Sequence, residues 1–298
     1  MKQLLFIVNP TAGRTTIKSC LFEIIETFTT HEYEVTVRPS IEKDDIKNIV
    51  ISQGNDFDLI VCAGGDGTLD QTVTGMISGN ITTPLGYIPC GTTNDFAKSL
   101  GIPKDPVRAA RRAVKYMPNP IDIGALKSDM HQDYFVYIAS FGAFTDVAYS
   151  TPQELKNILG HTAYIMEAVK TITSLKSYHV TITANGQKLT GDYIFAMVCN
   201  SLSVGGFRAI GTKDVEFDDG LFEVVLISYP QSPLELQSIL TSILMNSENE
   251  KHITTFKTDH IEFHAEEAIP WDLDGEYGGD HTDVEIEVYN QALNLVRK

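Results

Sequence analysis

The feature of this sequence best suited to chemistry is a glycine-rich turn with an aspartate in its middle. Gly64-Gly65-Asp66-Gly67-Thr68 follows an apolar run typical of a buried strand and precedes a segment with helical spacing. Backbone N–H groups at such a helix start can bind a phosphate, and glycine lets the backbone approach the ligand closely. A tight turn alone needs no aspartate, whereas carboxylates bind the Mg²⁺ that accompanies phosphates. The turn therefore predicts a phosphate site with Asp66 beside the metal.

Two more turns of this kind follow predicted strands, at residues 9–14 and 89–95. The carboxyl ends of parallel strands lie at one sheet edge, so we expect the three turns to form one ligand cleft. Arg14 is either a solvated loop charge or the partner of a phosphate. The residues predicted to line the cleft are Asn9, Pro10, Gly13, Arg14, Gly64, Gly65, Asp66, Gly67, Thr68, Gly91, Thr92, Asn94 and Asp95.

The glycine pattern excludes two common nucleotide sites. Asp70 occupies the third glycine position of the dinucleotide-binding fingerprint, and the sequence contains no P-loop of the Walker type. The turn at 64–68 is therefore predicted to be a phosphate loop of another kind.

Residues 1–125 alternate between strand and helix patterns, which predicts the domain that holds the three turns. Strands separated by helix-length segments form a parallel sheet covered on both faces. We therefore expect a Rossmann-like α/β domain at 1–125. Its predicted strands are 4–9, 34–39, 58–65 and 84–91, and its predicted helices are 17–28, 44–54 and 68–78.

Residues 126–289 are rich in β patterns and predict a second, mostly antiparallel domain. Asn185-Gly186, between two alternating runs, is the strongest hairpin signal. We expect the tail 290–298 to pack back on the first domain. The predicted strands are 134–143, 178–184, 187–199, 220–228, 258–265 and 282–289, and the predicted helices are 152–176 and 232–246.

Composition and charge limit the classes of partner that this chain is expected to bind. The 298 residues carry a formal net charge of −16, which argues against nucleic acid as a partner and against tight adhesion to anionic membranes. No apolar run is long enough to span a bilayer, and the first residues fit a strand better than a signal peptide. We expect a cytoplasmic protein. Its four cysteines, Cys20, Cys62, Cys90 and Cys199, lack metal-binding spacing, which fits a reducing cytoplasm. Cys62 and Cys199 stand in apolar runs and fit buried free thiols.

The three turns also carry a resemblance to a known family. NPTAG, GGDGT and PCGTTNDFA stand in the order found in the bacterial soluble diacylglycerol kinases, a lipid kinase family, and the resemblance covers nearly the whole chain. GGDGT alone is shared with NAD kinases, whereas its combination with GTTNDFA and LDGE is specific. The further matching stretches are 121–124, 204–207, 219–222 and 271–276.

The resemblance implies ATP bound between an α/β domain and a β-sandwich domain. It implies that Glu276 is the general base for a lipid hydroxyl and that Asp66 organises Mg²⁺ and the phosphates. It also implies that Asp122 and Asp219 hold a structural Mg²⁺ through water. The sequence departs from the family in the loop 208–219, which lacks the usual Ala-Pro. The implied reaction is ATP-dependent phosphorylation of diacylglycerol to phosphatidic acid by a protein that contacts the membrane surface transiently, as a peripheral protein.

Other readings of the same residues stay open. The acceptor could be another lipid alcohol, such as ceramide or sphingosine, or it could be NAD, and a non-catalytic nucleotide-binding regulator is a further alternative. The stretch 274–276 also fits a plain hairpin turn, and the acidic stretch 214–219 also fits a solvated face.

Two remaining features have mainly structural interpretations. The apolar rows of 152–176 fit a core or homodimer interface, and a lipid-facing lid is the alternative, because Lys156, Lys170 and Lys176 could meet headgroups. His260 and His264 are four residues apart in a strand pattern, which is not a metal-binding spacing, so we expect surface or packing residues.

Overall fold

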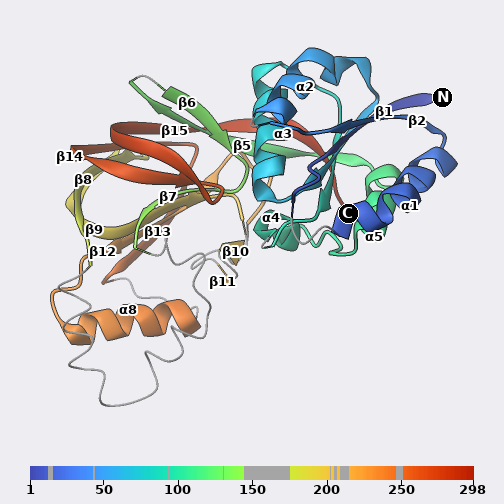
Figure 1. Cartoon of the computed structure of the whole chain (residues 1–298). Helices are drawn as coiled ribbons and strands as arrows, with labels where there is room; N and C mark the ends of the chain where they lie inside the picture. The colour runs from blue at the N-terminus through green and yellow to red at the C-terminus, as the bar shows by residue number, and fades with distance from the viewer. Residues whose placement is uncertain are drawn as a thin grey trace.

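The computed structural model describes most of this chain and shows a mixed α/β protein with many strands (Figure 1). The predicted helix at 152–176 lies outside the described residues except for its last two, which are not helical. Among the helices that the structure describes, none combines the length and hydropathy that crossing a bilayer requires. The described residues are 1–12, 16–42, 44–92, 94–129, 131–143, 175–201, 203–204, 207–208, 215–245 and 251–298.

Four strands of the first half pair in parallel, in the order β2-β1-β3-β4. Helices α2 and α3 lie on one face of these strands, and α1 and α5 lie on the other (Figure 1). All six residues of β3 are buried, as its continuous apolar run predicts. The bounds are β1 Lys2–Val8, α1 Thr16–Thr30, β2 Tyr33–Pro39, α2 Asp45–Gln53, a 3₁₀ turn at Gly54–Asp56, β3 Leu59–Gly64, α3 Asp66–Ser78, β4 Leu85–Pro89, α4 Asp95–Ser99 and α5 Pro106–Lys115.

The described strands of the second half pair antiparallel to one another. Asn185 and Gly186 both have positive φ (52° and 71°) and connect β8 to β9, as the predicted type I′ hairpin requires. The bounds are β5 Pro118–Ser128, β6 His131–Phe135, β7 Ile138–Gly142, β8 Tyr178–Ala184, β9 Gln187–Cys199, β10 Ser203–Val204, β11 Phe207–Arg208, β12 Phe222–Ser228, α8 Pro233–Met245, β13 Ile253–Thr258, β14 His260–Leu273 and β15 Glu276–Val296.

Strand β15 belongs to both halves. Its first part pairs with β14, and its last part pairs with β5 and, through Leu295 and Leu85, with β4. Thirteen of the described strands therefore form one continuous hydrogen-bonded sheet. The predicted domain boundary at residue 125 falls inside β5, and the division into two domains stays a prediction.

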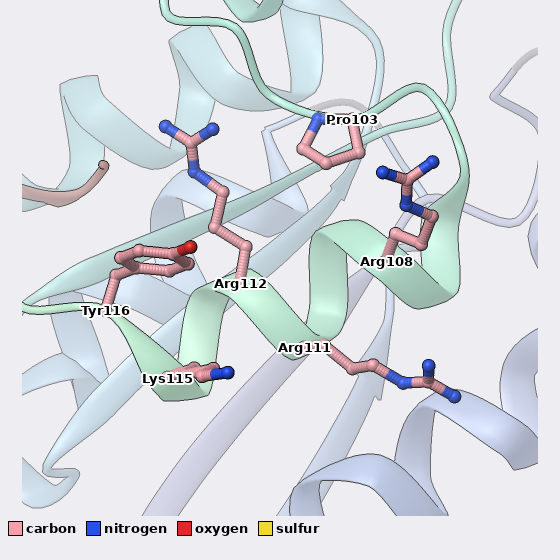
Figure 2. A pocket seen from close by; sticks show the side chains of 6 residues that line it. All are labelled: Pro103, Arg108, Arg111, Arg112, Lys115 and Tyr116. Carbon is pink, nitrogen blue, oxygen red and sulfur yellow. The ribbon is translucent and has the colours of Figure 1, made fainter.

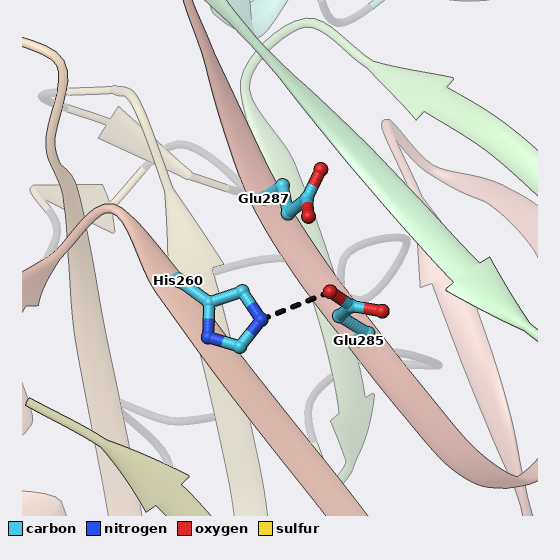
Figure 3. A group of neighbouring side chains, drawn as sticks. All are labelled: His260, Glu285 and Glu287. Carbon is cyan, nitrogen blue, oxygen red and sulfur yellow. Dashed lines mark hydrogen bonds and ion pairs between the residues drawn. The ribbon is translucent and has the colours of Figure 1, made fainter. Parts of the chain in front are cut away.

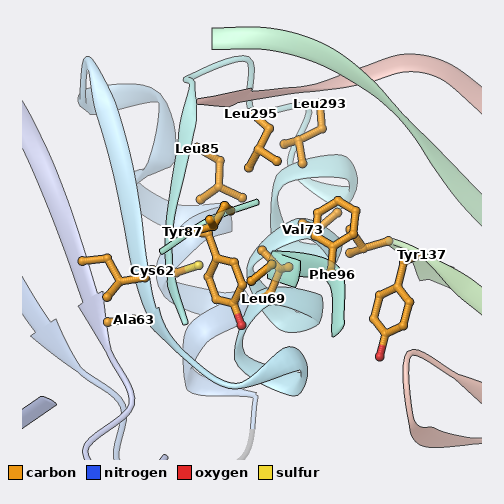
Figure 4. Packing of buried hydrophobic residues seen from close by; sticks show 14 of the residues in the cluster. Cys62, Ala63, Leu69, Val73, Leu85, Tyr87, Phe96, Tyr137, Leu293 and Leu295 are labelled. Atoms are coloured by element: carbon orange, nitrogen blue, oxygen red, sulfur yellow. The ribbon is translucent and has the colours of Figure 1, made fainter. Parts of the chain in front are cut away.

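The buried side chains form two clusters. The first contains the core of the first half together with buried residues of β7, β9, β12, α8 and β13, and the second lies within the second half. In the first, Leu293 and Leu295 of β15 pack with Leu85, Val73 and Phe96 (Figure 4). The second is built from alternate residues of β7, β8, β9, β12, β14 and β15, which therefore turn one face toward a shared core. Trp271 and Phe141 meet at its centre with ring centroids 5.0 Å apart.

Candidate active site

The turns that follow β3 and β4 lie against each other. A Cβ atom on Gly91 would lie 2.6 Å from the Cα of Gly65, so this approach requires glycine. The N–H of Cys90 donates to the carbonyl of Gly64 at 2.7 Å and locks the two strand ends together. The structure thus brings these two turns together at one sheet edge, as the parallel arrangement predicts.

Asn9 connects the first turn to the second. Its Nδ2 donates to Thr68 Oγ1 at 3.1 Å, and its Oδ1 accepts from the N–H of Thr11 at 3.0 Å. Thr68 in turn leaves no room for a side chain at Gly64, where a Cβ would lie 2.2 Å from Thr68 Oγ1. The first turn is described as far as Ala12, with Pro10 partly buried, and its predicted residues Gly13 and Arg14 lie outside the described residues.

Asn94 holds the shape of the third predicted turn. It has a positive φ of 48°, and its Oδ1 accepts the N–H of Gly91 at 2.9 Å while its Nδ2 donates to the Gly91 carbonyl at 2.7 Å. The side-chain amide is therefore engaged within the turn, and Asn94 positions the loop. Thr92 at the tip of the turn is exposed.

Asp66 opens α3 and faces the start of α4. Burial and the neighbouring Asp95 carboxylate raise the pKa of Asp66 to about 6, whereas the backbone N–H groups of Asn94 and Asp95 and the ammonium of Lys98 lower it. Asp95 is 4% exposed and bonds Lys98 at 2.8 Å. Within the described part of the chain, the buried Asp66 Oδ1 has no hydrogen-bond partner. An unpaired buried carboxylate oxygen beside a second carboxylate fits a cation.

Glu276 begins β15 and reaches over the start of α3. Its Oε1 lies 3.2 Å from the position that a Cβ on Gly67 would occupy, and the carboxylate is exposed. The tight turn of Asp274 and Gly275, with φ of 52° and 88°, reverses the chain between Leu273 and Glu276. The stretch 274–276 is therefore a hairpin turn, and it also presents a carboxylate to the glycine-rich turn.

Asp274 anchors this hairpin, and sequence reasoning assigned it no function. Its buried carboxylate accepts the N–H groups of Val136, Tyr137 and Ile138 at 2.5 to 3.0 Å. Burial raises the pKa of Asp274 to about 7, although these three donors lower it. Asp274 therefore fixes the position of Glu276 by tying its turn to the connection between β6 and β7.

Asp70 lies one helical turn after Asp66 and faces the same region. Burial raises its pKa well above the ordinary value, and the carboxylates of Asp274, Asp133 and Glu276 raise it further. The sequence showed Asp70 only as a departure from the dinucleotide fingerprint. Acidic groups from α3, β6 and the β14–β15 turn thus gather beside the glycine-rich turn.

The predicted metal residues Asp122 and Asp219 have protein partners. Asp122 is fully buried and accepts the N–H groups of Gly220 at 2.7 Å and Gln291 at 2.6 Å. Asp219 accepts the N–H of Leu221 at 3.0 Å through Oδ1 and the ammonium of Lys257 at 2.9 Å through Oδ2. Each of the four carboxylate oxygens thus accepts one hydrogen bond, and Lys257 supplies a positive charge next to Asp219. A carboxylate oxygen can accept more than one such contact, and the structural Mg²⁺ at these residues stays a prediction.

The two histidines of β14 pair with carboxylates on β15. His260 Nε2 lies 3.0 Å from Glu285 Oε1, with Glu287 close by (Figure 3), and His264 pairs with Asp283 at 2.5 Å. His260, Glu285 and Glu287 could together hold a metal ion. However, Glu287 already bonds Lys127 of β5. The pairs are partly or fully exposed, as expected of surface residues.

The four cysteines differ from the carboxylates of the candidate site in that they are structural residues. Cys62, Cys90 and Cys199 are buried, and Cys20 is partly buried. Burial raises the pKa of Cys62 and of Cys90 to about 12, so both stay protonated and unreactive. This agrees with the prediction of structural free thiols.

The comparisons with known proteins agree with this geometry. The profile "Diacylglycerol kinase catalytic domain" matches residues 3–126, and "YegS C-terminal NAD kinase beta sandwich-like domain" matches 139–297. The chain is 33% identical to the diacylglycerol kinase of Bacillus subtilis over 94% of this chain and 91% of that one. It is 29% identical to that of Staphylococcus carnosus over 93% and 90%.

A solved structure shows the same fold. The crystal structure of a putative diacylglycerol kinase from Bacillus anthracis matches with a TM-score of 0.80 and 24% sequence identity, covering 100% of this chain and 97% of that one. Phosphate-type turns at the end of a parallel sheet, beside gathered carboxylates, agree with the matched catalytic domain, which defines the class as a kinase. The chain belongs to the diacylglycerol kinase family, and the enzyme class predicted from the sequence is confirmed.

Proposed function

We propose that this protein transfers the γ-phosphate of ATP to the hydroxyl of diacylglycerol and forms phosphatidic acid. The observation that carries the proposal is the convergence of Asp66 and Glu276 on the start of α3, directly beside the paired glycine turns. Phosphoryl transfer depends on positioning and charge stabilisation more than on covalent catalysis. The names of the relatives supply the acceptor class.

The glycine turns are proposed to hold the ATP phosphates. Gly65 and Gly91 have no side chains, so a ligand can reach the backbone where the two turns meet. The N-terminus of α3 favours negative charge. Asn9 and Asn94 maintain the loops, with Thr92 exposed at the tip. Backbone donors at the turns would bind the phosphates, and the side chains would fix the turn geometry.

Asp66 and Asp95 are proposed to hold Mg²⁺. They are adjacent carboxylates in a partly buried site, and Asp66 Oδ1 has no hydrogen-bond partner among the described residues. A bound Mg²⁺ would neutralise charge on the phosphates. Asp66 must be ionised to act as a ligand, so the N–H groups of α4 and Lys98 assist by stabilising its charge.

Glu276 is proposed to be the general base. Its exposed carboxylate takes the proton from the lipid hydroxyl while the hydroxyl oxygen forms the new bond to the γ-phosphorus. The bond from that phosphorus to the bridging oxygen breaks, and ADP leaves with the electron pair. Asp274 keeps Glu276 in place through its three backbone hydrogen bonds.

The same proposal includes how the protein contacts the membrane, what its two matched regions do and how it assembles. We propose that the protein contacts the membrane transiently as a peripheral protein, because its acceptor is a lipid, and that its two matched regions act as a nucleotide domain and a lipid domain. A homodimer is proposed through the apolar stretch 152–176, which lies outside the described residues except for its last two. Asp122 and Asp219 are proposed to hold a structural Mg²⁺ through water, next to the ammonium of Lys257.

The test is transfer of labelled phosphate from ATP, with Mg²⁺, to acceptors in mixed micelles. Diacylglycerol, ceramide and sphingosine are offered separately, and NAD is offered in solution. We expect labelled phosphatidic acid from the wild type and a loss of turnover of about a hundredfold or more in Glu276→Gln, since a positioned base contributes about 10²–10⁴-fold.

Glu267→Gln is the matched control. Glu267 is an exposed glutamate on the same strand pair, away from the turn, so its removal should leave turnover unchanged. Label on a different lipid would replace diacylglycerol as acceptor and keep the chemistry. Label on NAD alone, or equal turnover in the Glu276→Gln variant and the control, would contradict the proposal.

A further inference from the structure

A basic pocket lies on the outer surface of the first half, on the helix α5. It has a volume of about 300 Å³ and is lined by Pro103, Arg108, Arg111, Arg112, Lys115 and Tyr116. This volume is at the lower end of the range of about 300–1,000 Å³ that small-molecule sites occupy. Figure 2 shows Arg108 and Arg112 on either side of Pro103, with Arg111 and Lys115 along the other edge of α5.

The fold places all four cations on one side of the helix. Val107, Ala109, Ala110 and Ala113 are buried, and α5 packs with them against β4 and α1. The charged residues are left on the outer face. Two pairs of like charge, Arg108 with Arg112 and Arg111 with Lys115, stand four residues apart, a spacing that destabilises a helix.

Protein carboxylates do little to neutralise this charge. In the ranges that the structure describes, Arg111 pairs with Glu23, with Nη2 3.8 Å from Oε1, and Arg108, Arg112 and Lys115 form no ion pair. The carboxylate of Asp105 accepts the backbone N–H of Arg108 at 2.8 Å. The whole chain carries 39 acidic against 23 basic residues, so an unneutralised group of four cations stands out.

Arg112 is the most constrained of the four. Its Nη1 and Nη2 donate to the carbonyls of Gly101 at 2.8 Å and Leu100 at 3.1 Å, just after α4. Its buried Nε has no partner among the described residues, and its guanidinium lies 5.9 Å from the ring centroid of Tyr116. These contacts fix the guanidinium at the pocket wall, which lowers the entropy cost of binding an anion there.

We propose that this pocket binds a phosphate monoester, at a site separate from the glycine-rich turns. Arginine matches phosphate oxygens with paired N–H donors, and a doubly charged anion relieves the repulsion among the four cations. The phosphate could belong to a soluble metabolite or to a phosphatidic acid headgroup, because both present the same group.

The test measures binding rather than turnover, so it does not depend on the proposed reaction. Labelled glycerol 3-phosphate is equilibrated with the full chain by dialysis at low salt, with the glycine-rich turns saturated by a non-hydrolysable ATP analogue and Mg²⁺. A parallel arm sediments the protein with phosphatidylcholine vesicles that contain or lack phosphatidic acid. The variant is Arg108→Gln/Lys115→Gln, because both side chains are exposed and hold no part of the fold.

We expect the variant to bind the phosphate group about tenfold more weakly than wild type, since it loses two charge-assisted contacts. Lys2→Gln/Lys188→Gln, which removes two exposed charges elsewhere, is the matched control and should bind like wild type. Binding of glycerol 3-phosphate identifies a soluble source, and binding of vesicles alone identifies a headgroup. Absence of binding in both arms, or equal binding by variant and wild type, overturns the proposal.

Discussion

Asp66 is a carboxylate held where its charge is unfavourable. Burial and Asp95 raise its pKa to about 6, whereas an unfolded aspartate titrates at about 3.9. Between these values the folded protein binds the proton more tightly than the unfolded chain, so the free energy of unfolding decreases as the pH rises through this range. At neutral pH the ionised Asp66 therefore lowers stability, a cost typical of groups kept for binding or catalysis.

This gives a prediction for Asp66→Asn. Without Mg²⁺ and nucleotide, the variant should melt at a higher temperature than wild type at pH 8, and the difference should shrink at pH 5, where Asp66 is largely protonated. Its kinase turnover should fall on the order of a hundredfold or more. Thermal unfolding at both pH values and the micelle assay measure these effects.

The control for this prediction is Asp56→Asn, which changes an exposed aspartate. It should leave both the melting temperature and the turnover close to wild type. An Asp66→Asn protein that melts below wild type at pH 8 would show that the carboxylate stabilises the fold in the absence of a cation.

Among the elements, the contact between the turns after β3 and β4 sets the geometry of the proposed phosphate site. A methyl group on Gly91 would meet backbone at Gly65, which cannot rotate away as a side chain can. We expect Gly91→Ala to separate the turns and to lower kcat/KM for ATP on the order of a hundredfold, as displacements of about 1 Å do in active sites.

Gly191→Ala is the matched control for this substitution. Gly191 lies in β9, and the nearest atom to its added Cβ would be 3.8 Å away. It should keep wild-type kcat/KM and a free energy of unfolding within about 0.5 kcal/mol of wild type. If Gly91→Ala keeps wild-type kcat/KM as well, the contact between the turns has no role in binding ATP.

The observed elements also show which features of the site could be predicted from the sequence. The meeting of the turns was predictable, because parallel strands place their carboxyl ends at one edge. The anchoring of the Glu276 turn by Asp274 could not be predicted, because the hydrogen-bond donors of Asp274 lie 136 to 138 residues away in sequence. The Lys257 partner of Asp219 is likewise 38 residues distant. Helix α5 was missed because alanines form much of its buried face and give little apolar contrast.

At the scale of the whole molecule, β15 is the element that joins the two halves. Leu295 is completely buried in the first cluster although it lies near the end of the chain. Leu295→Ala should lower the free energy of unfolding by about 2–5 kcal/mol, as other buried leucine truncations do. Urea unfolding measures it, with Leu234→Ala as the control, because Leu234 is 71% exposed. Equal losses in the two variants would contradict a structural role for the end of β15.

The placement of β15 also affects how the protein is made. During translation, residues 1–126 leave the ribosome while Leu293, Leu295 and Val296 are still to be added, yet these three side chains complete the first core. Until then the free edge of β4 and the apolar side chains beneath it have no strand to cover them, which exposes the nascent chain to aggregation. The first half therefore completes its core only after the second half has been synthesised.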